Sequence, residues 1–158
     1  MTVEGPVGAG YAEAVRAARE AAGKDPGELA AALDISYAAY WDIESYDDEI
    51  TSVVSFAQAV KLANIIELDL RRLFGAGDGV LTFDELAAAV SARVSDSTLE
   101  QVEDELGWEL GGALVRPAAF ADFPLDALAD IAGPFGLDWR HLLPRLTSQI
   151  GTPFTPPA

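Results

Sequence analysis

The sequence lacks cysteine and contains a single histidine, and these absences exclude several kinds of site. Without thiols there is no disulfide framework and no thiolate metal site. The absence of cysteine fits an oxidising and a reducing compartment equally well. A zinc site would need carboxylates alone and is not expected. No apolar stretch approaches membrane-spanning length, and residues 1–10 have neither the basic region nor the apolar run of a signal peptide. We therefore expect a cytoplasmic protein without membrane contact.

Positive charge is also scarce, and it is unevenly distributed. The chain has 10 Lys and Arg against 26 Asp and Glu, which gives a formal net charge of -16. No basic residue occurs between Lys24 and Lys61. This balance disfavours nucleic acid and anionic membranes as partners and favours a basic protein. A solvated acidic surface, adapted to high salt, is the alternative interpretation of the same charge.

Apolar residues recur at helical spacing along most of the chain, which predicts an all-α fold. Gly23 is expected to end the first helix. The polar, acidic segment from Tyr46 to Ser52 has no apolar stripe, so no helix is expected there. Polar residues that can cap a helix precede the apolar runs, and most of them have Glu or Gln three residues later. The expected caps are Asp25, Ser36 and Ser55 in the first half and Thr82 and Ser97 in the second.

The two halves of the chain resemble each other in sequence. LDLRRLF (Leu68–Phe74) and LDWRHLL (Leu137–Leu143) align at an offset that also aligns the helices before them, and Phe83–Val90 parallels Tyr11–Ala18. An internal duplication explains this better than chance similarity among helices rich in Ala and Leu. The predicted organisation is a flexible N-terminus (1–10), a first helical domain (11–74), a linker (75–81), a second helical domain (82–144) and a tail (145–158).

Residues 11–74 resemble the lambda-repressor-like (Cro/C1-type, XRE-like) helix-turn-helix domain. The resemblance rests on VRAAREAAG (Val15–Gly23), ELAAALDIS (Glu28–Ser36), Asp42-Ile43-Glu44 and the run Ser55–Phe74. It implies a five-helix bundle, and most members of that family are dimeric DNA-binding regulators. Residues 82–144 look like a degenerate copy. We expect the two copies to pack as a pseudo-dimer, with one continuous helical bundle as the alternative.

The departures from the family pattern fall on the positions that would face DNA. The resemblance places Tyr37, Ala38, Trp41 and Asp42 toward the major groove. After the Glu of the recognition helix the family usually has a basic residue, Gly and another basic residue, whereas this chain has the acidic run Ser45–Glu49. Phosphate contacts supply most DNA affinity, and carboxylates here would be repelled by them. The DNA contacts of the family are therefore not transferred to this chain.

Two further segments carry signals that we interpret as structural. Trp108 to Arg116, the recognition segment expected in the second copy, should be interrupted at Gly111-Gly112, because adjacent glycines cost roughly 2 kcal/mol of helix propensity. Residues 78–85 look like the back half of an EF-hand loop, but Phe74 and Ala76 would occupy its first and third positions, so calcium is not expected. No nucleophile elbow, phosphate loop or dinucleotide signature occurs, and neither an enzyme nor a cofactor is predicted.

A group of aromatic and acidic residues in and after the third expected helix remains. Aromatic anchors with a polar rim are typical of protein interfaces, although Trp41 and Tyr46 could instead pack against the second half. We expect a regulatory protein, a monomeric pseudo-dimer or a homodimer, that binds a basic protein, for instance as an inhibitor or immunity protein. A DNA-binding transcriptional regulator from an acidic proteome is the alternative. The candidate partner-binding residues are Tyr37, Ala38, Trp41, Asp42, Tyr46, Asp47, Asp48 and Glu49.

Overall fold

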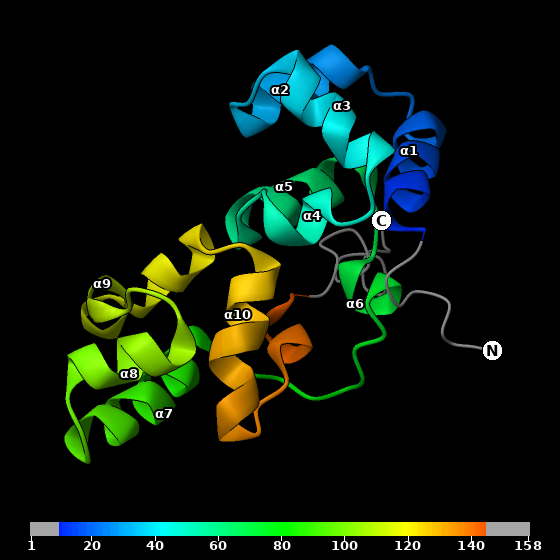
Figure 1. Ribbon diagram of the computed structural model, residues 1–158. Helices are drawn as coiled ribbons and strands as arrows, with labels where there is room; N and C mark the ends of the chain where they lie inside the picture. Colours follow the sequence, from blue (N-terminus) through cyan, green and yellow to red (C-terminus); the bar gives the residue numbers. More distant parts are fainter. Residues whose placement is uncertain (1–9, 145–158) are drawn as a thin grey trace.

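The computed structural model describes residues 10–144, and all regular elements in that range are helices, as predicted. Figure 1 shows α1–α3 at one end and α7–α9 at the other, with α4, α5 and α10 between them. The first half contains α1 (Tyr11–Ala21), α2 (Pro26–Leu33), α3 (Tyr37–Ser45), α4 (Glu49–Ser52), α5 (Phe56–Ile66) and α6 (Leu70–Leu73). The second half contains α7 (Phe83–Ser95), α8 (Leu99–Leu106), α9 (Gly111–Val115), α10 (Leu125–Ala132) and the 3₁₀ helices η1 (Pro117–Asp122), η2 (Gly133–Phe135) and η3 (Trp139–Leu142).

Four of the predicted helix caps are confirmed. The side chains of Asp25, Ser36, Ser55 and Thr82 each accept a hydrogen bond from a backbone amide in the first turn of the helix that follows. Asp25, Ser55 and Thr82 also form complete capping boxes, because the side chain three residues later accepts a hydrogen bond from the backbone amide of the cap. These local signals position α2, α3, α5 and α7.

The predicted cap of α8 is wrong by one residue. Thr98 rather than Ser97 caps this helix, and its hydroxyl accepts a hydrogen bond from the Gln101 amide at 3.1 Å. The Ser97 hydroxyl instead contacts the side-chain oxygen of Gln101 at 2.6 Å. Both side chains can cap a helix, but it is Thr98 that has the extended backbone conformation of a capping residue.

A short helix, α4, occupies part of the segment that was predicted to be non-helical. Ile50, the apolar residue within this acidic stretch, has only 1% of its surface exposed. One helical turn brings this side chain into the core while Asp48 stays exposed. A single apolar residue produces no stripe, so the pattern could not reveal the helix.

Gly111 and Gly112 begin a helix, α9, instead of interrupting one. Gly107 adopts a left-handed conformation (φ 85°) at the end of α8, and α9 starts only at Gly111. The carboxylate of Glu103 accepts hydrogen bonds from the amides of Leu110 and Gly111, at 2.6 and 3.2 Å. The helical segment expected from Trp108 is thus replaced by a fixed turn and a shorter helix.

One hydrophobic core runs through both halves. Aromatic rings join them at two places: Phe74 meets Trp139 with ring centroids 5.3 Å apart, and Phe56 meets Phe83 at 5.1 Å. Tyr11 packs edge-on against Phe74 at 4.9 Å, which extends the first contact to α1. The core is thus shared between the two halves.

Two of the polar contacts between the halves are reciprocal. The alignment of Leu68–Phe74 with Leu137–Leu143 makes Arg71 equivalent to Arg140 and Phe74 equivalent to Leu143. Arg71 donates a hydrogen bond to the Leu143 carbonyl at 2.9 Å, and Arg140 donates one to the Phe74 carbonyl at 3.1 Å. The same register aligns Ser55 with Pro124, and these two positions form an antiparallel bridge.

Candidate partner-binding surface

Two aromatic side chains lie together on the exposed side of α3. Tyr37 and Trp41 are one helical turn apart, and their rings meet edge to face with centroids 6.0 Å apart. Their exposed fractions are 53% and 38%. Neither ring is among the buried residues of the hydrophobic core or the partly buried residues that pack against it. The ring contacts between the halves are those of Phe74 with Trp139 and of Phe56 with Phe83.

Near its C-terminal end, α3 is anchored by a buried charge pair. Glu44, whose side chain is fully buried, accepts two hydrogen bonds from the Arg19 guanidinium, at 2.5 and 3.1 Å, and one from the Tyr40 hydroxyl at 2.6 Å. Arg19 also donates to the Lys24 carbonyl at 3.1 Å. A bidentate pair fixes orientation as well as distance. It locks α3 onto α1 and so determines which side chains α3 exposes.

The ionisation of this cluster reflects its surroundings. The hydrogen bonds to Glu44 raise the pKa of Arg19 further above its ordinary value. Burial raises the pKa of the Tyr40 hydroxyl well above its usual range, and its hydrogen bond to Glu44 adds to the shift. The cluster is thus a fixed ion pair with a neutral phenol, and this arrangement is suited to holding helices together.

Acidic residues lie in α3, at Asp42, and at the start of α4, at Asp48 and Glu49. Burial raises the pKa of Glu49, and the nearby charges of Asp42 and Asp48 raise it further. Glu49 is therefore close enough to Asp42 and to Asp48 to be repelled by both. Asp48 is exposed, while Asp42 and Glu49 are partly buried. Like charges held together cost folding energy, which a cationic partner would relieve.

Asp47 is occupied within the protein. Its two carboxylate oxygens accept hydrogen bonds from the amides of Gly10 and Ala12, at 3.0 and 2.9 Å, at the start of α1. Of the remaining predicted residues, Ala38 is exposed and Tyr46 has 58% of its surface exposed. The predicted surface thus lies around α3 and α4, with Asp47 turned toward α1. The contacts of Asp47 with Gly10 and Ala12 could not be inferred from the local sequence, because these residues lie far from it along the chain.

The three cations of α1 and of the segment after it are paired with acids. Arg16 pairs with Glu13, and Lys24 lies 3.8 Å from Glu28. Arg19 is held by Glu44.

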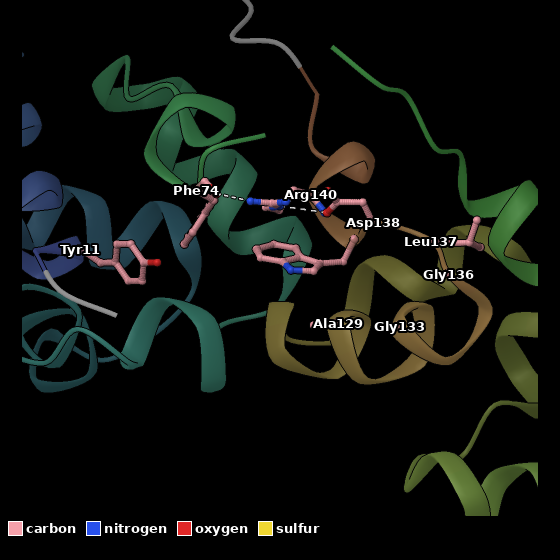
Figure 2. Close-up of a pocket in the computed structure, with 9 residues that line it drawn as sticks. Tyr11, Phe74, Ala129, Gly133, Gly136, Leu137, Asp138 and Arg140 are labelled. Carbon is pink, nitrogen blue, oxygen red and sulfur yellow. Dashed lines mark hydrogen bonds and ion pairs between the residues drawn. The ribbon is translucent and has the colours of Figure 1, made fainter. Parts of the chain in front are cut away.

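A separate hollow of about 470 Å³ lies where the two halves meet. Figure 2 shows Tyr11 and Phe74 on one side of it and Ala129 of α10 with Gly133 of η2 on the other, with Arg140 between them. Its charged groups are engaged with one another: Arg140 binds both oxygens of Asp138, at 3.0 and 2.8 Å. The Arg140 hydrogen bond lowers the pKa of Asp138. We interpret this hollow as a junction between the halves.

Within residues 10–144 no group of three or more His, Asp or Glu side chains is arranged to hold a metal ion. Glu85, which the EF-hand-like segment would offer as a ligand, instead accepts a hydrogen bond from the Thr82 amide at 2.8 Å.

None of the helices in the described part of the chain is both long and apolar enough to cross a lipid bilayer.

Comparisons of the chain with protein-family models, with curated proteins and with solved structures found no match. The function is therefore inferred from the chain's own sequence and geometry.

Proposed function

We propose that this protein regulates a basic protein by binding it through the surface around α3 and α4. The observation that carries the proposal is the exposed Tyr37–Trp41 ring pair on α3, together with the carboxylates of Asp42 in the same helix and of Asp48 and Glu49 at the start of α4. A large indole at an interface centre, surrounded by a polar rim, is the usual composition of a binding hot spot. The acidic rim gives long-range attraction to a cationic partner.

We further propose that the halves are two helix-turn-helix-like units that form a pseudo-dimer within one chain. The reciprocal Arg71 and Arg140 contacts support this interpretation, as does the matching order of helices in the two halves. In such an arrangement α3 occupies the place of a recognition helix but presents rings and acids. An acidic surface there resembles the charge of a nucleic acid, so a partner that acts on nucleic acid is the preferred class.

The test is affinity capture with matched variants, followed by mass spectrometry. Trp41→Ala should weaken capture of a basic protein strongly and leave the melting temperature nearly unchanged, because the ring is outside the core. Val115→Ala is the control, since Val115 is 86% exposed but lies in the second half. Equal capture by both variants contradicts the proposal. So does submicromolar binding of duplex DNA by the wild type at about 0.15 M salt, because non-specific affinity is typically weaker than that.

A further inference from the structure

The second half carries a cleft of about 450 Å³ that the surface around α3 does not include. The rings of Trp108 and Phe123 form its aromatic part, with centroids 6.0 Å apart. Glu109 and Asp122 supply its carboxylates, and Gly107 and Pro124 complete the lining. Both acids are exposed, and neither forms an ion pair with any described residue. The cleft therefore combines π faces with negative charge that is not yet neutralised.

Both walls of this cleft are fixed by backbone hydrogen bonds. On one side, the Glu103 contacts to the amides of Leu110 and Gly111 hold the turn that carries Trp108. On the other side, the Phe123 carbonyl accepts a hydrogen bond from the Phe56 amide at 2.8 Å. The indole nitrogen of Trp108 also lies 3.4 Å from a carboxylate oxygen of Asp130. A preformed site loses little conformational entropy when a ligand enters.

The chain already uses this combination of groups to hold a guanidinium. The Arg93 guanidinium carbon lies 5.3 Å from the centroid of the Phe135 ring, and a nitrogen of the same group lies 2.8 Å from Glu105. A planar guanidinium stacks on an aromatic face and binds carboxylates at its edge. The cleft offers the same two partners, with two rings and two acids.

We propose that the Trp108 cleft binds an arginine side chain of the basic partner. This inference rests on the proposed function for the class of partner, but it assigns a second contact point on the other half of the molecule. The guanidinium would stack on one of the two rings and meet the other at its edge, and Glu109 and Asp122 would accept its N–H groups. Arginine is favoured over lysine because its planar group can stack on a ring face, whereas an ammonium is a compact, strongly hydrated charge.

The test uses acetylated tetra-arginine amide as a probe of the full-length protein, followed by NMR of the indole N–H groups. The chain has three tryptophans, so each signal can be assigned with a single Trp→Phe variant. The Trp108 signal should move saturably with the probe. The double variant Glu109→Gln, Asp122→Asn should weaken that binding by roughly fivefold, as expected for two exposed ion pairs. Tetra-lysine should bind more weakly.

The charge-matched control is Asp84→Asn with Asp96→Asn, two exposed acids of the same half that lie outside the cleft lining. It should leave the Trp108 response unchanged. The proposal is overturned if the Trp108 signal does not move, if both double variants weaken the probe equally, or if tetra-lysine binds as tightly. The proposed function is tested separately, because it depends on Trp41 and on capture of the natural partner.

Discussion

Arg71 and Arg140 each donate a hydrogen bond to the backbone carbonyl that ends the other's segment, at 2.9 and 3.1 Å. Arg71 is buried, and it also binds the carbonyls of Gly77 and Gly79 at 2.5 and 2.6 Å. One side chain therefore satisfies three carbonyls in and around the linker between the halves. The pair fastens the two halves to each other and fixes the path of the connection.

Replacing Arg71 should weaken the protein far more than replacing its neighbour. Arg71→Met leaves three carbonyls without their donor, and we expect a loss of roughly 2 kcal/mol or more in the free energy of unfolding. Arg72→Met is the control, because Arg72 is exposed. Urea denaturation of both variants measures the difference. Equal stabilities would show that the carbonyls are satisfied without Arg71.

Separating the halves should destabilise both. Fragments 1–78 and 79–158 each lose the ring contacts of Phe74 with Trp139 and of Phe56 with Phe83, together with the core around them. Small domains bury a low fraction of their surface and are marginal on their own. We expect neither fragment to melt cooperatively at the temperature of the intact chain, as measured by calorimetry. A fragment that does so would be an independent domain.

Stability should fall as the pH rises above about 10, where an unfolded tyrosine ionises. Folded Tyr40 stays neutral there because burial and the Glu44 hydrogen bond raise its pKa, so only the unfolded state releases the proton. Tyr40→Phe should reduce this slope, and at pH 7 it should cost about 1–2 kcal/mol for the lost hydrogen bond. Tyr46→Phe is the control because its ring is at the surface. The measurement is the urea midpoint of each variant across this pH range. If the midpoints of Tyr40→Phe and Tyr46→Phe fall equally steeply with pH, the effect does not come from Tyr40.

Removing one acid from the surface around α3 and α4 should increase stability. The raised pKa of Glu49 means that its charged form is disfavoured in the folded state, so it lowers stability at pH values above the unfolded pKa of about 4.3. Glu49→Gln should therefore raise the urea midpoint at pH 7, and the gain should vanish in acid. Glu100→Gln is the matched control, an exposed glutamate in the first turn of α8. If Glu49→Gln still raises the urea midpoint at a pH where Glu49 is protonated in both the folded and the unfolded protein, the gain has a different cause.

The sequence predicted what depends on near neighbours and missed what depends on distant ones. The caps at Asp25 and Ser55 need only a residue three positions away, and both were found. The Arg19–Glu44 pair and the Asp47 contacts to α1 join positions far apart in the chain, and no local pattern marks them. The sequence does carry one signal for the buried Glu44. It follows the apolar Ile43 and lies one helical turn after Tyr40, on the same side of α3.

The predicted surface was specified less well than the fold. Tyr37 and Trp41 were predicted to be exposed and Tyr40 to be in the core, and the structure agrees for all three. The role of Asp47 differs from the prediction because its carboxylate turns inward to backbone amides. The cleft at Trp108 was not predicted, since it forms only when the turn after α8 meets the segment after η1.

The inward turn of Asp47 links the surface around α3 and α4 to the beginning of α1. Its neighbours Tyr46 and Asp48 are exposed, so a molecule that settles on them contacts the same loop that holds the amides of Gly10 and Ala12. Any rearrangement of that loop changes how often those amides open to solvent. Hydrogen exchange at Gly10 and Ala12 is therefore a readout of occupancy from outside the contact area itself.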